Sequence, residues 1–207
     1  LGMIRGIRAA GVDLIFTATR QPDVAEAHQK LGFALVGKMP LRLRPLRPFR
    51  LLAKHKGAGV LAPLCGPADA LYKLAAGRKP AADVPIEELA LESDEVEDLV
   101  SLINSPDNDL VRQVWTPEQF RRRFRTTLDG TGYRITTTRT DGKLVAALIT
   151  TLVERGNNIR AGIILDIAAL PSASLAQLNS LVADAERFAH ERGAEVMLAL
   201  ERTLFLR

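Results

Sequence analysis

Three β-prone runs follow one another closely in the second half of the chain, and this spacing restricts the fold more than any other feature. The runs cover residues 133–138, 143–154 and 160–170. Asp-Gly at 141–142 and Gly-Asn-Asn at 156–158 separate them, and both combinations favour the left-handed backbone of tight hairpin turns. The sequence therefore predicts an antiparallel meander of three strands.

A strand and two helices are predicted before this meander. Residues 86–91 are predicted to form a strand, and residues 93–103 a helix with Ser93 as its N-cap, an acidic first turn and apolar positions at helical spacing. Thr116 is the expected N-cap of the second helix, because Pro117 then occupies the first helical position and a Gln the third. The order up to the meander is thus strand, helix, helix.

One more helix and strand are predicted after the meander. Residues 175–192 have an amphipathic pattern, which Gly193 ends. Residues 194–200 are almost entirely apolar and short, as in a buried strand. A helix stopped by glycine and followed by a strand also occurs at 3–18, so this arrangement is the nearest approach to an internal repeat.

The stretch from Gly11 to Phe33 predicts a compact strand–turn–helix unit. Its first part is a short apolar run bounded by glycine and a polar cluster, which favours a buried strand. Pro22 suits the first turn of the following helix because its missing N–H costs nothing there, and Gly32 ends that helix.

The end of this unit resembles a known family. The residues His28-Gln29-Lys30-Leu31-Gly32-Phe33 are similar to the Tyr-x-Lys-x-Gly-Phe ending of the GCN5-related N-acetyltransferase (GNAT) fold. The resemblance implies an α/β fold of the α+β type with a mixed sheet. It also implies that this helix and the strand before it form one side of an acyl-CoA cleft, with acetyl-CoA as the co-substrate.

The order of the predicted elements resembles two incomplete GNAT copies in tandem. Residues 1–48 would be the C-terminal part of a first domain, 49–85 a basic and partly helical linker, and 86–207 a second domain without its last helix and strands. Because position 1 is not a Met, we expect the chain to be a piece of a longer protein. With half of each cleft missing, it should have little acyltransferase activity by itself.

The resemblance also implies site residues. His28 holds the position at which many family members have a Tyr that protonates the leaving thiolate, and His can donate a proton near neutral pH. Gln21 holds a position at which family members have an Asn. The alternative for His28 is a structural contact with Phe33 or with the sheet. The residues expected to bind the cofactor are Leu1, Gly2, Phe16, Thr17, Gln21, Ala25 and Lys30.

The second copy lacks the residues that bind a pyrophosphate. Its strand-to-helix turn, residues 169–175, contains no glycine, so its backbone cannot readily turn N–H groups toward phosphates. A helix capped by Ser172 or Ser174 is the expectation. We therefore interpret residues 86–207 as a degenerate domain that is structural or shapes the substrate site.

A basic segment supports a second hypothesis. No acidic residue occurs from Ala27 to Ala68, whereas this segment contains eight cations. A field of one sign favours a polyanion, so a non-catalytic GNAT-like protein that holds an anionic polymer or partner through residues 30–56 is the alternative function. A solvated basic linker would explain the same pattern. The cations are Lys30, Lys38, Arg42, Arg44, Arg47, Arg50, Lys54 and Lys56.

Composition sets broad limits. The 207 residues are 47% hydrophobic and 25% charged with a net charge of +4, as in globular proteins with one large core or two modest ones. The single cysteine, Cys65, excludes an intramolecular disulfide, and neither it nor the histidines have metal-ligand spacing. We expect a cytoplasmic protein without a transmembrane segment or metal. Its acceptor would be a small-molecule or polymer amine, and nucleic acid is not an expected partner.

The two incomplete copies would each leave sheet edges unpaired. We therefore expect them to combine into one composite sheet or to associate with another copy of the chain. The specific hypothesis is that residues 35–44 lie beside a strand of the second copy, most plausibly residues 196–200.

Overall fold

The computed structural model describes residues 21–34, 41–57, 62–77, 84–105, 114–125 and 132–200. The chain divides into two compact units, residues 1–38 and 39–207, and each is treated by itself. In the first unit the described element is helix α2 (Pro22–Lys30). None of the described helices is both long and apolar enough to cross a membrane.

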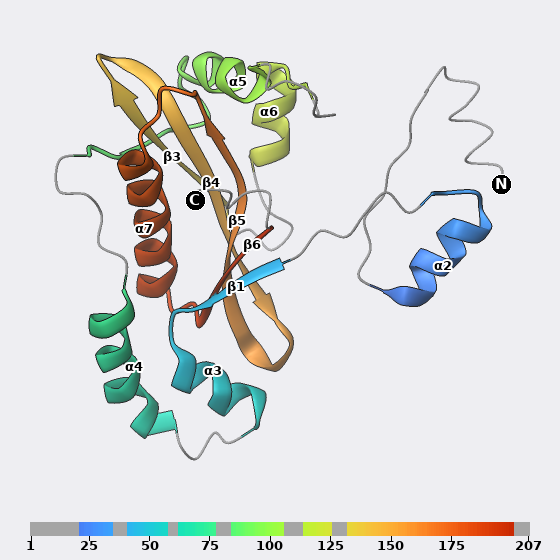
Figure 1. Ribbon diagram of the computed structural model, residues 1–207, viewed down its shortest axis with the longest axis vertical. Helices are drawn as coiled ribbons and strands as arrows, with labels where there is room; N and C mark the ends of the chain where they lie inside the picture. Colours follow the sequence, from blue (N-terminus) through green and yellow to red (C-terminus); the bar gives the residue numbers. More distant parts are fainter. Residues whose placement is uncertain are drawn as a thin grey trace. The chain divides into compact units, whose positions relative to one another are not determined.

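The second unit is built on a six-stranded mixed sheet (Figure 1). Its strands run in the order β1-β6-β5-β4-β3-β2. Neighbouring strands are antiparallel except β5 and β6, which are parallel. The strands are β1 (Leu41–Pro45), β2 (Glu87–Glu88), β3 (Tyr133–Thr140), β4 (Lys143–Arg155), β5 (Ile159–Ala169) and β6 (Val196–Leu200).

The predicted pairing with residues 196–200 is confirmed for residues 41–44, whereas residues 35–40 lie outside the described residues. Strand β1 pairs antiparallel with β6, with Leu41 opposite Leu200 and Pro45 opposite Val196. Residues separated by about 150 positions thus share one ladder, and β1 supplies the edge that β6 would otherwise expose.

The meander is also confirmed, with both turns at the predicted places. Asp141 and Gly142 have φ values of 50° and 77°, as a type I′ hairpin requires. Asn157 and Asn158, at 61° and 54°, likewise use the left-handed region that Asn tolerates better than most residues.

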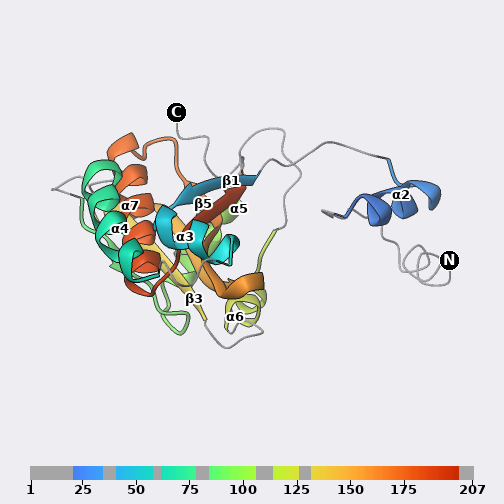
Figure 2. The same cartoon turned by 90° about the horizontal axis from the view of Figure 1, so that it is seen from below.

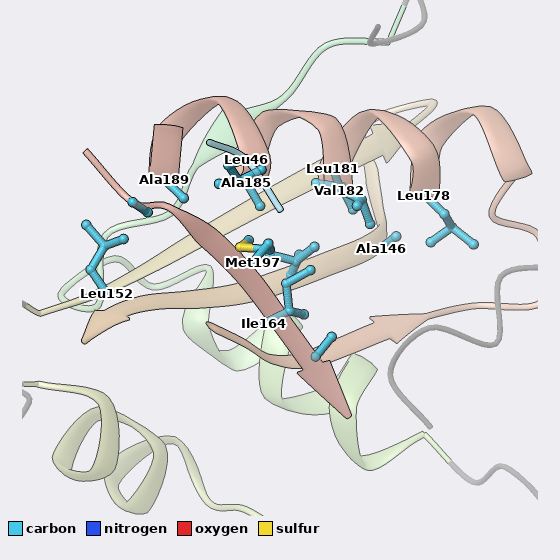
Figure 3. Packing of buried hydrophobic residues seen from close by; sticks show 13 residues of the cluster. Leu46, Ala146, Leu152, Ile164, Leu178, Leu181, Val182, Ala185, Ala189 and Met197 are labelled. Carbon is cyan, nitrogen blue, oxygen red and sulfur yellow. The ribbon is translucent and has the colours of Figure 1, made fainter. Parts of the chain in front are cut away.

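Helix α7 (Leu175–Glu191) covers one face of the sheet (Figure 2). Its apolar face, with Leu181, Val182 and Ala185 all at most 1% exposed, packs on Ala146 and Met197 of the strands (Figure 3). Burying a Leu or Val side chain contributes roughly 1.5–3 kcal/mol relative to leaving it exposed, so this layer is a main source of stability.

Gly162 on β5 lets this helix approach the sheet closely. A Cβ at this position would lie 2.8 Å from the Cβ of Ala189 on α7 and 2.5 Å from the Sδ of Met197 on β6. The first distance cannot be relieved by a flexible side chain, so glycine is required here by packing rather than by its φ angle.

Helices α5 (Val96–Asn104) and α6 (Pro117–Phe124) cover the opposite face. They enclose a second core with Ile135 and Ile149 of the strands. The predicted cap of α6 is present, because Thr116 Oγ1 accepts from Gln119 N and Gln119 Oε1 accepts from Thr116 N.

Two sequence predictions in this region need correction. Ser93 is not the N-cap of α5: its Oγ accepts from Glu95 N in a turn, and the helix begins only at Val96. The strand predicted over 86–91 is reduced to β2, residues 87–88, because Leu89 N still donates to Ile135 O but the chain then turns at 91.

The segment 49–85, predicted to be a partly helical linker, contributes two packed helices, α3 (Pro48–His55) and α4 (Ala62–Ala76). The sequence predicts a helix from Ala68, but α4 begins six residues earlier and Pro67 lies inside it. A proline normally stops a helix, but here it costs only the bond to the carbonyl four residues earlier, which is still in the first turns. Gly57, with φ +67°, follows the end of α3.

Ion pairs join these helices to the sheet. Glu195, beside β6 and only 1% exposed, accepts from Lys54 Nζ of α3 at 2.8 Å and from Arg160 N at 2.7 Å. Arg44 of β1 pairs with Glu186 of α7 at 3.2 Å and donates to the carbonyl of Ala76 at the end of α4. Buried carboxylates therefore hold β1 and α3 to the neighbouring elements of the second unit.

Candidate functional site

The His28-to-Phe33 motif forms a specific helix end. Gly32, with φ +92°, donates from N to Gln29 O, and Phe33 N donates to His28 O, which together make a Schellman motif. The rings of His28 and Phe33 lie 5.3 Å apart between centroids, which is the apolar contact that accompanies such a cap. The Lys-x-Gly-Phe pattern is thus explained locally by the need for a left-handed residue after the helix.

The described part of the predicted site lies on α2. Gln21 is its N-cap residue, and its carbonyl accepts from Ala25 N. Ala25 and half-buried His28 follow at intervals of four and three, so the three positions share one face of the helix. Lys30 lies on another face and pairs with Glu26 at 2.7 Å, where both side chains are exposed.

The other four predicted cofactor residues, Leu1, Gly2, Phe16 and Thr17, lie outside the described residues. The role of His28 as an acid and the cofactor contacts therefore remain predictions. The alternative interpretation of His28, a contact with Phe33, agrees with the observed ring contact.

The turn before α7 is closed by its own side chains. Ser174 Oγ accepts from Gln177 N, and Gln177 Oε1 accepts from Ser174 N, which is a capping box. Ala173 N donates to Leu170 O, and Leu170 N donates to Val145 O. Because these N–H groups already have acceptors, they are not free to receive phosphates. Of the two predicted caps, Ser174 is the one used.

A pocket of about 660 Å³ lies at the other end of α7. It is bounded by the start of α3, one side of α4 and the last turn of α7. A volume of this size suits a small organic molecule. The residues that line it are Arg47, Arg50, Gly66, Asp69, Ala70, Lys73, Leu74, Gly77 and His190.

Positive charge dominates the polar groups of this pocket. Arg47, Arg50 and Lys73 face one carboxylate, Asp69, which is 4% exposed. Asp69 is already used as a cap for α3, since its carboxylate oxygens accept from Phe49 N at 2.9 Å and from Arg50 N at 3.4 Å. Arg50 and Lys73 form no ion pair with any residue in the described parts of the chain.

His190 adds no positive charge at neutral pH. Its partial burial, followed by the charges of Lys73 and Arg47, lowers the pKa of the imidazole below its usual value. Glu191 and Asp69 oppose this shift and do not cancel it. The net charge at the pocket is therefore set by three cations and one carboxylate.

The sequence predicted part of this pocket. Arg47 and Arg50 belong to the basic segment, but Asp69, Lys73 and His190 were not identified as site residues. Lys73 stands four residues after Asp69 in α4, and this spacing was the available signal. His190 could not be associated with them from sequence, because it joins the pocket only through packing of α7. Among the described residues, no group of three or more His, Cys, Asp or Glu could hold a metal ion.

Comparison by sequence identifies no relative: no protein-family profile and no curated protein matches the chain. Comparison of structures does. A GCN5-related N-acetyltransferase from Anabaena variabilis aligns with 95% of this chain at a TM-score of 0.53 and 12% identity. The chain has the GNAT fold. The predicted fold class, α/β with a mixed sheet, is confirmed with it.

Other solved structures match a smaller part of the chain. Glucosamine-6-phosphate N-acetyltransferase from Arabidopsis thaliana aligns with 56% of this chain and 80% of its own, at 20% identity and a TM-score of 0.45. A tandem GNAT protein from the clavulanic acid biosynthesis pathway aligns with 54% of this chain and 34% of its own, at 16% identity and a TM-score of 0.46. The chain spans 41% of the length of the Anabaena protein.

Proposed function

We propose that this protein is an acyl-CoA-dependent N-acyltransferase that transfers an acetyl group from acetyl-CoA to an amine. The observation that carries the proposal is the GNAT sheet, in which β5 and β6 are parallel and β1 closes the edge. The acceptor would be a small-molecule or polymer amine. The aligned structures include proteins named as N-acetyltransferases, which supports the reaction class.

The chemistry is direct attack of a neutral amine on a thioester. The new C–N bond forms as the C–S bond breaks, the amine loses a proton, and the CoA thiolate gains one. His28 is proposed as the acid that protonates the thiolate, because its ring lies on the same face of α2 as Gln21 and Ala25. Acetyl-CoA, when bound, supplies the acyl group and the leaving thiolate.

We also propose separate roles for the parts of the chain. Residues 1–48 would belong to the domain that binds the cofactor, residues 49–85 would connect the domains, and 86–207 would be a degenerate second domain. The capping box between Ser174 and Gln177 supports the last assignment, because it occupies N–H groups at the helix start where phosphates would otherwise bind.

The test is release of free CoA thiol from acetyl-CoA by the full-length protein with a panel of amines. We expect His28→Gln to lower kcat by about 10²-fold or more with little change in KM for acetyl-CoA, as for loss of a general acid. His55→Gln, an exposed histidine at the end of α3, is the matched control and should leave kcat unchanged. Full activity in His28→Gln would refute the catalytic role of His28 and leave only its structural contact with Phe33 at the helix end. Absence of CoA release with all amines would contradict the proposed acyltransferase activity.

The alternative, a binding protein that holds an anionic polymer along residues 30–56, is weakened by the ion pairs. Lys30, Arg44 and Lys54 each pair with a carboxylate, so the segment does not present one continuous positive surface. Of the other cations of the segment, Arg47 and Arg50 line a pocket.

A further inference from the structure

We propose that the pocket between α3, α4 and the end of α7 binds a small organic phosphate, with Arg50 and Lys73 as the groups that contact the anion. This site goes beyond the proposed acyl transfer. It lies at the C-terminal end of α7, a helix of 17 residues. At 1.5 Å per residue, that is about 24 Å from the turn at the start of the helix.

The charge at the pocket matches a dianion. Arg47, Arg50 and Lys73 against Asp69 leave a net charge of two, since His190 is neutral at pH 7. A phosphate monoester carries about −1.5 to −2 at this pH, whereas a simple carboxylate carries −1. A phosphate also offers three strong acceptor oxygens, enough for a guanidinium and an ammonium together.

The cations are available to a ligand. Asp69 is held by the N–H groups of α3, so it does not neutralise them by a direct ion pair in the described structure. Arg47 donates from one terminal nitrogen to His190 O, but its buried Nε has no hydrogen-bond partner among the described residues. An unpartnered buried donor is costly, and an anion or a water that it positions would relieve it.

The backbone at the start of α3, which carries Arg47, is bonded to the chain beside β6. Leu46 N and Arg47 N both donate to Glu195 O, at 2.8 and 3.0 Å. The side chain of the same Glu195 binds Lys54 further along α3. This side of the pocket is therefore ordered without a ligand, which reduces the entropy lost on binding.

The remainder of the pocket has no charge. Gly66, Ala70, Leu74 and Gly77 line it on the α4 side, so the anionic end of a ligand would be accompanied by an uncharged organic portion. Gly66 is also useful experimentally, because a Cβ at this position meets no atom within 4 Å. A larger side chain there would enter open space, and in a helix it also improves on glycine.

Phenyl phosphate is the probe, with benzoate and phenol as the monoanionic and neutral analogues, and binding is measured by isothermal titration calorimetry on the full chain. We expect one phenyl phosphate per chain, benzoate weaker by about tenfold or more, and no binding of phenol. Arg50→Gln combined with Lys73→Gln should weaken phenyl phosphate at least about tenfold, because both charge-assisted contacts are lost. Gly66→Leu should abolish binding by filling the pocket while the protein stays folded.

Lys56→Gln is the matched control: it removes a nearby exposed charge that does not line the pocket, and binding should stay within about twofold. An equal loss in this control would show non-specific attraction and overturn the proposal. So would unchanged binding in Gly66→Leu, or no binding of phenyl phosphate at millimolar concentration. Acetyl-CoA affinity should not change in the pocket variants; its loss there would assign the pocket to the acyl donor instead of a separate ligand.

Discussion

Replacing Lys54 by Met should destabilise the second unit, because it leaves the carboxylate of Glu195 buried without its cation. The Lys54 side chain is 33% exposed and that of Glu195 2%, with 2.8 Å between the charged atoms. Exposed pairs contribute about 0.2–1 kcal/mol, and breaking a fully buried pair costs about 3–5 kcal/mol. The half-covered lysine places the cost between these limits, at about 2 kcal/mol. Glu195 keeps its bond from Arg160 N, which limits the loss.

The measurement is urea unfolding at 25 °C for Lys54→Met, Glu195→Gln and the double variant. If the pair is coupled, the double variant should lose about 1 kcal/mol less than the sum of the single losses. Lys56→Met, an exposed lysine two residues away, is the control and should stay within about 0.5 kcal/mol of the parent. Additive losses, or a Lys54→Met cost no larger than that of the control, would refute the conclusion that α3 is anchored through Glu195.

Two further predictions concern helix α7 and its neighbours. Gly162→Ala should lower the free energy of unfolding in urea by about 1–3 kcal/mol, because the new Cβ overlaps that of Ala189. Gly156→Ala is the control and should be nearly neutral, because its Cβ would have no atom within 4 Å. Equal losses in the two variants would contradict the packing argument. His190 should titrate below its usual pKa in NMR, and Lys73→Gln should raise that pKa; no response would exclude Lys73 as a cause. Because folding lowers the pKa of His190, its neutral form stabilises the folded state. This contribution to the free energy of unfolding is complete above the unfolded pKa of about 6.5 and is lost as the pH falls through the lower pKa of the folded state.

Short-range features were predicted well from sequence. The capping box at Thr116 and the hairpin at Asp141 depend on residues within four positions of one another, so their chemistry is complete in the local sequence. The start of α4 was missed. A proline ordinarily ends a helix, but Pro67 lies in the first turns of α4, where it costs one backbone hydrogen bond.

The pairing of β1 with β6 was predicted from a different kind of information. Nothing local to residues 41–45 specifies β6 as a neighbour. The prediction came from the hypothesis that the chain contains two incomplete GNAT copies whose missing strands complement each other. The catalytic assignment of His28 rests on the same resemblance, and the structure adds that its ring also serves the Schellman cap with Phe33. A match between His28 and the family motif can thus arise from the local requirements of the helix end alone.

The sequence by itself determined the order of most elements and the turns and caps at Thr116, Asp141 and Ser174, since these act over a few residues. The bounds of α4, α5 and β2 were not determined in this way. Tertiary structure alone decided which charges meet. Glu195 is paired with Lys54, 141 positions away, and Arg47 and Lys73 come to His190 only because three helix ends converge. The cost of burying charge depends on distant partners, and those partners are chosen by the packing of the whole chain.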